Sequence, residues 1–284
     1  MLLGSHVSIA GGMHTAISRG EEIGCAAIQI FTKNANRWQA KPLQEHDITR
    51  FQDAWHNSGI DVVIAHDSYL INLGTPKEEL WHKSQHALQI ELKRCEQLGI
   101  PYLVMHPGSH VGSGEENGLQ RVAESFDIIH RRTEGFTTKI LIETTAGQGT
   151  NLGYRFEHIA HIFELVHEPD RLGVCLDTCH IFAAGYELRT AEGYQKTMTA
   201  FDRLIGLDRL QTIHLNDSLK PLGSRIDRHQ EIGKGEIGLE GFRWLMNDGR
   251  LRENPMILET PKGDDPVASD LENLRILRSL SNDP

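Results

Sequence analysis

The sequence predicts an α/β protein that folds as a closed (β/α)8 barrel, a TIM barrel, in a single domain spanning residues 1–284. Short apolar runs alternate eight times along the chain with stretches of helical length. The runs are nearly continuous in apolarity, which is typical of strands buried on both faces of a parallel sheet. The length also fits, since about 250 residues is usual for this barrel.

The expected strands are mostly rich in leucine or β-branched residues, and several follow a glycine or proline by a few positions, as Gly59, Pro101 and Pro255 do. Eight such runs are the number that closes a barrel. In chain order they are Leu2–Ser8, Ala27–Phe31, Asp61–Ala65, Tyr102–Met105, Lys139–Ile142, Gly173–Leu176, Gln211–Leu215 and Met256–Leu258.

The stretches between the strands mix polar and apolar residues with helical spacing. Leu88, Leu92, Cys95 and Leu98, for example, recur every three or four positions, as on a buried helix face. The clearest expected helices are Glu45–Asn57, Lys77–Leu98, Leu119–Arg132, Arg155–Val166, Ala191–Ile205, Leu239–Asn247 and Pro266–Leu280. An open α/β sheet is the alternative, although no GxGxxG motif follows the first strand to indicate a dinucleotide site.

The composition excludes two classes of protein. With 39% apolar and 24% charged residues, the chain is not intrinsically disordered. Its 29 basic and 39 acidic side chains give a formal charge of −10, which argues against a protein that holds a polyanion by bulk positive charge. Sixteen histidines are outside that sum.

No segment predicts a membrane span or a secretory signal. There is no apolar run of about 18 residues, and the N-terminus lacks a basic start and a long apolar stretch. The four cysteines (Cys25, Cys95, Cys175 and Cys179) have no disulfide or zinc-ribbon spacing. We therefore expect reduced thiols in a cytoplasmic protein.

Histidines and carboxylates follow the carboxyl ends of the third to eighth strands. In a barrel these ends form one ring, which is where active sites are built. The residues expected to converge there are His66, His106, Glu143, Asp177, His180, His214, Asp227, His229 and Glu259. Any one of them alone has an ordinary explanation, such as a hydrogen-bonded histidine or a helix N-cap. All nine at one mouth predict bound cations, because buried polar groups are costly when unsatisfied.

Imidazole and carboxylate donors without thiolate suit zinc, manganese or iron, and five imidazoles favour zinc. At about four ligands per zinc ion, nine donors suit two or three ions. Paired metals about 3.5–4 Å apart stabilise both the attacking and the leaving oxygen of a phosphoryl displacement. The pattern thus favours metal-assisted phosphoester hydrolysis.

The remaining histidines are assigned more ordinary roles. His6 ends the first strand and His110 follows HPGS, so we expect either to orient a metal ligand from outside the metal site. Surface or packing roles are expected for the six histidines on predicted helices, namely His82, His86, His130, His158, His161 and His167.

Seven stretches then allow a comparison with a known family. They are HDSYLINLG (66–74), HPGSH (106–110), ETTAGQGTNLG (143–153), LDTCHIFAAGY (177–186), HLNDS (214–218), SRIDRHQEIGKGEIG (224–238) and ETP (259–261). The chain closely resembles the endonuclease IV family of zinc-dependent apurinic/apyrimidinic endonucleases over essentially its whole length. The resemblance implies a TIM barrel and a DNA base-excision repair enzyme.

The resemblance also implies a trinuclear zinc site, with manganese possible at one position. His66, His106 and Glu143 would hold one ion. Glu143 would bridge to a second, held also by Asp177, His214 and Glu259. The third would be bound by His180, Asp227 and His229, and the catalytic residues would be Glu143, Glu259 and Asp227.

The substrate implied by the resemblance is duplex DNA with an abasic site or a blocked 3′ end. The family cleaves the phosphodiester 5′ to the abasic sugar, leaving a 3′-hydroxyl and a 5′-deoxyribose phosphate. Tyr69 matches a tyrosine that inserts into the DNA. Arg37 lies about one position after the family's inserting arginine, with Asn36 in its place. The cations expected near phosphates are Lys33, Arg37, Lys41, Arg225 and Arg228.

A single-metal sugar isomerase or epimerase on a similar barrel is the alternative function. Such enzymes resemble this chain at Glu143, Asp177, His214 and Glu259, but have no use for the five further ligands His66, His106, His180, Asp227 and His229. Nothing in the sequence demands an oligomer, a membrane or an obligate protein partner, so a monomer is expected.

Overall fold

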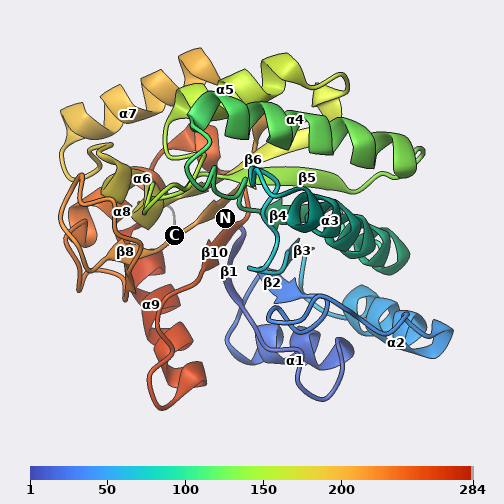
Figure 1. Cartoon of the computed structure of the whole chain (residues 1–284). Coiled ribbons are helices and arrows are strands. Elements are labelled where there is room, and N and C mark those ends of the chain that lie inside the picture. Colours follow the sequence, from blue (N-terminus) through green and yellow to red (C-terminus); the bar gives the residue numbers. More distant parts are fainter. Residues whose placement is uncertain (283–284) are drawn as a thin grey trace.

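Eight parallel strands close into a barrel in the computed structural model, which describes residues 1–282 (Figure 1). Around the barrel the strands follow the order β1-β10-β7-β6-β5-β4-β3-β2. Their bounds are β1 (Leu3–His6), β2 (Ala27–Phe31), β3 (Val62–His66), β4 (Tyr102–Met105), β5 (Lys139–Glu143), β6 (Leu172–Asp177), β7 (Leu210–His214) and β10 (Met256–Leu258). The predicted (β/α)8 fold is confirmed, and closure of the sheet excludes the open alternative.

The helices lie around the outside of this barrel (Figure 1). In the described part of the chain they are α1 (His14–Glu22), α2 (Glu45–His56), α3 (Glu78–Leu98), α4 (Glu115–Arg132), α5 (Phe156–Leu165), α6 (Thr178–Ala184), α7 (Ala191–Leu204), α8 (Gly238–Met246) and α9 (Pro266–Leu280). Three 3-10 turns precede or follow strands: η1 (Pro169–Arg171), η2 (Leu207–Arg209) and η3 (Gly249–Leu251). A short antiparallel pair, β8 (Asp217–Ser218) with β9 (His229–Gln230), lies beyond β7.

Three of these elements differ from what the sequence pattern indicates. Helix α4 begins at Glu115 rather than Leu119, because its first turn is polar and contains Gly118, so it carries no apolar periodicity. Helices α1 and α6 are not among the clearest expected helices. Helix α6 begins directly after β6, where the Asp177 carboxylate caps it by accepting from the backbone N–H of His180.

Alternation along the strands creates polar and apolar tiers inside the barrel. A buried apolar tier inside the barrel consists of Ala27, Ile64, Val104, Leu141, Cys175 and Ile257. Because side chains on a strand repeat every two residues, the residue two positions later also faces inward. Those next residues are Gln29, His66, His106, Glu143, Asp177 and Glu259, which form a polar tier at the carboxyl end. His6 on β1 and His214 on β7 also point into the barrel, because the same two-residue alternation holds on those strands.

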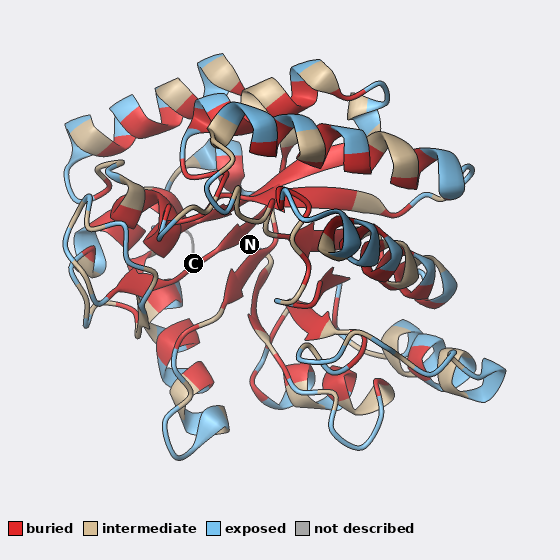
Figure 2. Ribbon diagram, viewed as in Figure 1, coloured by how far each residue is buried: buried red, intermediate tan, exposed pale blue. Residues whose placement is uncertain are grey.

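The alternate, outward-facing residues of the strands pack against the helices. Ile28, Val63, Leu103 and Ile142 all lie in the main hydrophobic core and are essentially inaccessible to solvent. Figure 2 shows the strands as buried, whereas α3 and α4 alternate buried and exposed residues along their length. Burial on both faces explains the nearly continuous apolar runs of the strands.

The four cysteines are buried and unpaired. Burial raises the pKa of Cys25, Cys175 and Cys179 to about 12, so these thiols stay protonated near neutral pH. Among the helices described, none combines the length and the apolar character needed to cross a membrane.

His130 on α4 is a buried histidine that does not belong to the polar tier. Its side chain is 2% exposed and stacks on Phe126, and neither ring nitrogen has a hydrogen-bond partner within the described residues. Burial, together with the charge of Arg171, lowers the pKa of His130 to about 4.

We therefore predict that His130 makes the fold acid-sensitive. The folded protein keeps this ring neutral, whereas the unfolded chain binds a proton near pH 6.5. The free energy of unfolding should fall by up to about 3 kcal/mol as the pH drops from 6.5 to 4. Urea unfolding across this range should show a weaker pH dependence for His130→Leu. The exposed His46, changed to leucine, is the control. Equal slopes for wild type and His130→Leu would contradict the prediction.

Candidate metal centre

The nine ligand-type residues singled out in the sequence come together at the carboxyl end of the barrel. Seven of them belong to the strand ends or to α6, whereas Asp227 and His229 come from the segment that pairs with β8. Three groups have donor atoms within 4.8 Å of one another: His66 with His106 and Glu143; Glu143 with Asp177, His214 and Glu259; and His180 with Asp227 and His229. Two further groups of the same compactness contain Cys175 or Cys179. Their protonated thiols make them poorer cation sites.

Glu143, fully buried at the end of β5, lies at the centre of the cluster. Its Oε2 atom is 3.1 Å from His66 Nε2 and 2.9 Å from His106 Nε2. The other oxygen, Oε1, is 2.9 Å from His214 Nδ1 and 3.3 Å from His180 Nδ1. The two oxygens of one carboxylate thus face different groups of histidines, as a bridging ligand requires.

The other carboxylates extend the cluster to either side. Glu259 Oε2 lies 3.2 Å from His214 Nδ1. Asp227 is more exposed and has one oxygen 3.2 Å from His180 Nε2 and the other 3.4 Å from His229 Nε2. The carboxylate of Asp177 belongs to the group with Glu143, His214 and Glu259, and its Oδ2 atom lies 3.9 Å from His214 Nδ1.

The electrostatics of the cluster depend on this pairing. Burial by itself would raise the pKa of Glu143, but the neighbouring His106 and His214 hold it well below its usual range. Burial likewise disfavours a charged His180, yet Asp177 and Asp227 raise its pKa well above the usual value. Without a cation, the carboxylates are therefore compensated by protons on the histidines, and a cation would take the place of those protons.

Four of the five histidines have one ring nitrogen engaged by an oxygen that is not a carboxylate of the ligand groups. His66 donates from Nδ1 to the carbonyl of Asp67 at 3.0 Å. His180 donates from Nδ1 to the carbonyl of Thr144 at 2.8 Å, and His229 from Nδ1 to that of Glu259 at 3.1 Å. The fourth, His214, contacts Gln29. With Nδ1 protonated, His180 and His229 turn unprotonated Nε2 atoms toward each other at 3.3 Å. Both Nε2 atoms also face oxygens of Asp227, so either a proton or a cation can satisfy this arrangement.

Asp217, which the sequence analysis did not single out, holds the segment that follows His229. Its buried carboxylate accepts from the backbone N–H groups of five residues: Ser218, Gly233, Gly235, Ile237 and Gly238. Gly235 approaches so closely that an added Cβ would lie 2.5 Å from Asp217 Oδ1. The glycine pattern of the 224–238 stretch is the signal that could have indicated such a turn.

Asn216 links two of the carboxylate ligands. Its side-chain amide donates to Asp177 Oδ2 at 2.6 Å, and its Oδ1 accepts from the backbone N–H of Glu259 at 2.9 Å. Asn216 is completely buried, so both contacts are shielded from water. This residue therefore fixes Asp177 relative to the end of β10.

A cavity of about 350 Å³ opens beside the first ligand group. His66, His106 and Asp227 line it, together with Tyr69. The Tyr69 side chain is 62% exposed and meets Phe31 edge-on, with ring centroids 5.5 Å apart. An exposed aromatic ring thus stands at the rim of the mouth, next to the buried donors.

The expected phosphate-contacting cations fall into two sets. Arg37, Lys41, Arg225 and Arg228 are exposed on loops, with the Arg225 guanidinium stacked 4.0 Å from the Tyr154 ring centroid. Lys33 requires a correction, because it is only 7% exposed and pairs with the buried Glu91 at 2.9 Å. Its Nζ also donates to the carbonyl of Arg37 at 2.7 Å. Lys33 therefore anchors the loop and does not face solvent.

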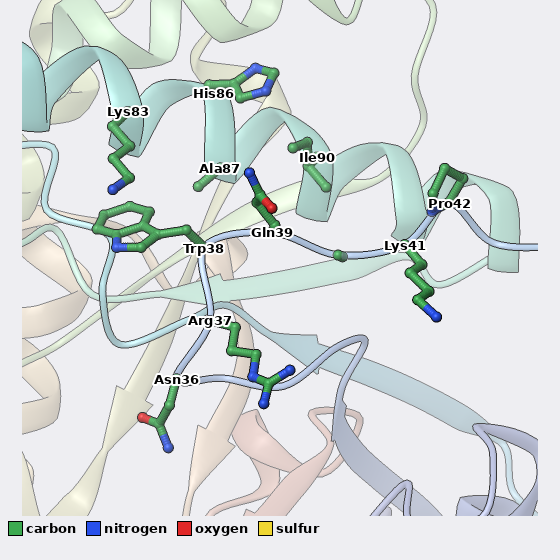
Figure 3. A pocket seen from close by; sticks show the side chains of 11 residues that line it. Asn36, Arg37, Trp38, Gln39, Lys41, Pro42, Lys83, His86, Ala87 and Ile90 are labelled. Atoms are coloured by element: carbon green, nitrogen blue, oxygen red, sulfur yellow. The ribbon is translucent and has the colours of Figure 1, made fainter.

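This loop after β2 has two faces. Residues 36–42 line a cavity of about 960 Å³ against α3. Figure 3 shows Trp38 and Gln39 turned toward α3, with Lys83 over the Trp38 ring, whereas Asn36 and Arg37 point away from the helix. The helix thus fixes one face of the loop and leaves Arg37 free.

The two histidines expected to orient ligands differ in position. His6 Nδ1 lies 3.1 Å from Glu259 Oε1, so it contacts a proposed ligand. His110 is bound instead to its own turn, where Nδ1 accepts from the backbone N–H of Gly114. Of the six histidines expected on helices, His130 and His158 are buried and the others are partly or fully exposed. His167 lies beyond the end of α5, so its predicted place on a helix is wrong.

The comparisons with known proteins agree with the barrel fold. A family model described as a xylose isomerase-like TIM barrel matches residues 17–280. A protein of Chloroflexus aurantiacus named probable endonuclease 4 is 55% identical over 277 residues, covering 98% of this chain and 97% of that protein. The crystal structure of endonuclease IV from Thermus thermophilus is 37% identical, with a TM-score of 0.88, over 99% of this chain and 98% of that one.

The chain belongs to the endonuclease IV family. The resemblance found in the sequence motifs is thereby confirmed. A 3-keto-D-glucoside 4-epimerase from E. coli has a TM-score of 0.70 with this endonuclease IV family member, covering 98% of this chain and 99% of that one, at 16% identity. That likeness shows a shared fold alone.

We predict that Asp217 is needed for local order around the metal centre. Asp217→Ala removes the acceptor of five backbone N–H groups. Each hydrogen bond to a charged acceptor contributes about 1 kcal/mol or more to stability. Hydrogen–deuterium exchange should then show lost protection in residues 233–238. Changing the exposed Asp61 to alanine is the control. Unchanged exchange in Asp217→Ala would show that the segment is held by other contacts.

Proposed function

We propose that this protein is an apurinic/apyrimidinic endonuclease. It hydrolyses the phosphodiester 5′ to an abasic site in duplex DNA, leaves a 3′-hydroxyl and a 5′-deoxyribose phosphate, and removes groups that block 3′ ends. The observation that carries this proposal is the convergence of nine imidazole and carboxylate donors at the barrel mouth, in a chain of the endonuclease IV family.

The donor set fits a cluster of three zinc ions, with manganese possible at one position. His66, His106 and Glu143 would hold one ion, and Glu143, Asp177, His214 and Glu259 a second. His180, Asp227 and His229 would hold the third. Nitrogen and carboxylate oxygen are donors that zinc accepts, and the Nε2 atoms of His180 and His229 lie close enough together to bind one cation with Asp227. When bound, such ions supply Lewis acidity and activate water for attack on phosphorus.

The protein residues position both the cluster and the substrate. Glu143 joins two groups because its oxygens face different histidines. We propose Glu143, Glu259 and Asp227 as the residues on which catalysis depends most. In hydrolysis, water adds to phosphorus while the bond to the 3′-oxygen breaks, and that oxygen leaves as the new 3′-hydroxyl.

The rim residues suit a nucleotide that has been turned out of the duplex. A missing base lowers the cost of extrusion, because less stacking and pairing is lost. The exposed Tyr69 ring beside the cavity supports the proposal that this residue fills or stacks against the distorted DNA. Arg37, Lys41, Arg225 and Arg228 are the loop cations available to phosphates. With a formal charge of −10, the protein holds DNA through this mouth and not through bulk charge.

We predict incision at a single abasic analogue in a labelled duplex by zinc-loaded protein. The product should migrate as a strand that ends in a 3′-hydroxyl and is extendable by a polymerase. Metal analysis of the same preparation should find close to three ions per chain. The undamaged duplex is the control. One bound ion together with sugar isomerase or epimerase activity would overturn the proposal in favour of the alternative function.

We also predict that Glu143→Gln keeps the fold and loses nearly all incision, by about 100-fold or more, because the neutral amide cannot bridge two cations. Single-turnover incision and circular dichroism measure the two effects. Glu115→Gln is a matched control, since Glu115 pairs with His158 at 3.3 Å outside the metal centre. Retained incision in Glu143→Gln would contradict the bridging role.

A further inference from the structure

Strand β2 contributes one polar side chain to the interior of the barrel. Within Ala27–Phe31, Gln29 is the only polar residue, and it is completely buried. It lies two positions after Ala27 of the apolar tier, so its side chain points into the polar tier with the proposed metal ligands. A buried carboxamide is costly unless all its hydrogen bonds are made.

The Gln29 amide connects two of the proposed ligands. Its Nε2 donates to Glu259 Oε1 at 2.6 Å and lies 3.0 Å from His6 Nδ1. Its Oε1 lies 2.8 Å from His214 Nε2. Because a carboxylate only accepts hydrogen bonds, the amino end must face Glu259, and the carbonyl end must face His214.

This orientation determines the tautomer of His214. The carbonyl oxygen of Gln29 can only accept, so His214 Nε2 carries the hydrogen and donates it. The other ring nitrogen, Nδ1, faces Glu143 Oε1 and Glu259 Oε2 at 2.9 and 3.2 Å, and its lone pair becomes available when a cation takes the place of the proton held there. A cation among these three atoms would then be bound through Nδ1.

Gln29 differs from the groups that orient the other histidines. His66, His180 and His229 donate to backbone carbonyls, which no substitution removes. Among these four, His214 is the one that has a side chain in place of a backbone carbonyl as this acceptor. The contribution of such an orienting contact can therefore be measured here by changing one residue.

We propose that Gln29 is a positioning residue for the metal group formed by Glu143, Asp177, His214 and Glu259. It fixes His214 as the Nε2–H tautomer and restrains Glu259, so that both present donor atoms to the same ion. This inference rests on the proposed function, because it concerns the same metal centre. Gln29 itself belongs to none of the three ligand groups.

The test compares zinc binding by metal-free wild type, Gln29→Met and Gln85→Met, measured by competition with a chromophoric chelator. Methionine keeps the approximate size of glutamine and loses both hydrogen bonds. Gln85 is an equally buried glutamine on α3, bonded to Ser125 and remote from the ligands. We expect one of three zinc ions to bind about 10–100-fold more weakly in Gln29→Met, with the other two unchanged. Gln85→Met should bind like wild type.

A second measurement needs no change at Gln29. Nitrogen NMR of the zinc-loaded wild type should show His214 protonated at Nε2, with its signals assigned by their absence in His214→Gln. A proton at Nδ1, or three unchanged zinc affinities in folded Gln29→Met, would overturn the inference while leaving wild-type incision intact. Failure of the wild type to bind zinc or to incise the abasic duplex would overturn the proposed function as well.

Discussion

Closure of eight parallel strands into a barrel forces every second side chain of each strand into a narrow interior, and the position of the metal centre follows from this constraint. The tier at Ala27, Ile64 and Val104 fills the middle of the barrel with apolar groups. Two residues later the same strands deliver Gln29, His66 and His106 to the carboxyl end. Each strand that supplies packing in one tier thus supplies a polar side chain, at its end or directly after it, in the next.

A second consequence is the concentration of buried charge. Four carboxylates and five histidines share one end of the barrel, where water is largely excluded from Glu143 and Asp177. Such groups are tolerated only when they compensate one another or hold cations. Two kinds of contact therefore hold these side chains in place. They bond to one another, and the histidines also bond to backbone carbonyls such as those of Thr144 and Asp67.

The loops around the mouth are held by buried polar contacts and so keep the rim in place. Asp217 gathers the N–H groups of the segment after His229. After β2, the Lys33–Glu91 pair ties the loop to α3, which leaves Arg37 exposed. In both places a buried charged residue supports a loop, although the sequence predicts a phosphate contact for Lys33.

The sequence by itself determined the barrel and the set of ligand-type residues, because both depend on local pattern. Apolar runs, their eightfold alternation and a histidine or carboxylate after six strands can all be read without knowing which strands are neighbours. The tertiary structure decided what depends on depth and on contacts between distant segments. Lys33 is buried against Glu91, 58 positions away, and the role of Gln29 depends on contacts with His214 and Glu259. One glutamine in an apolar strand does not by itself indicate a function. The direction of its side chain has a meaning only once the barrel is closed and the neighbouring residues are known.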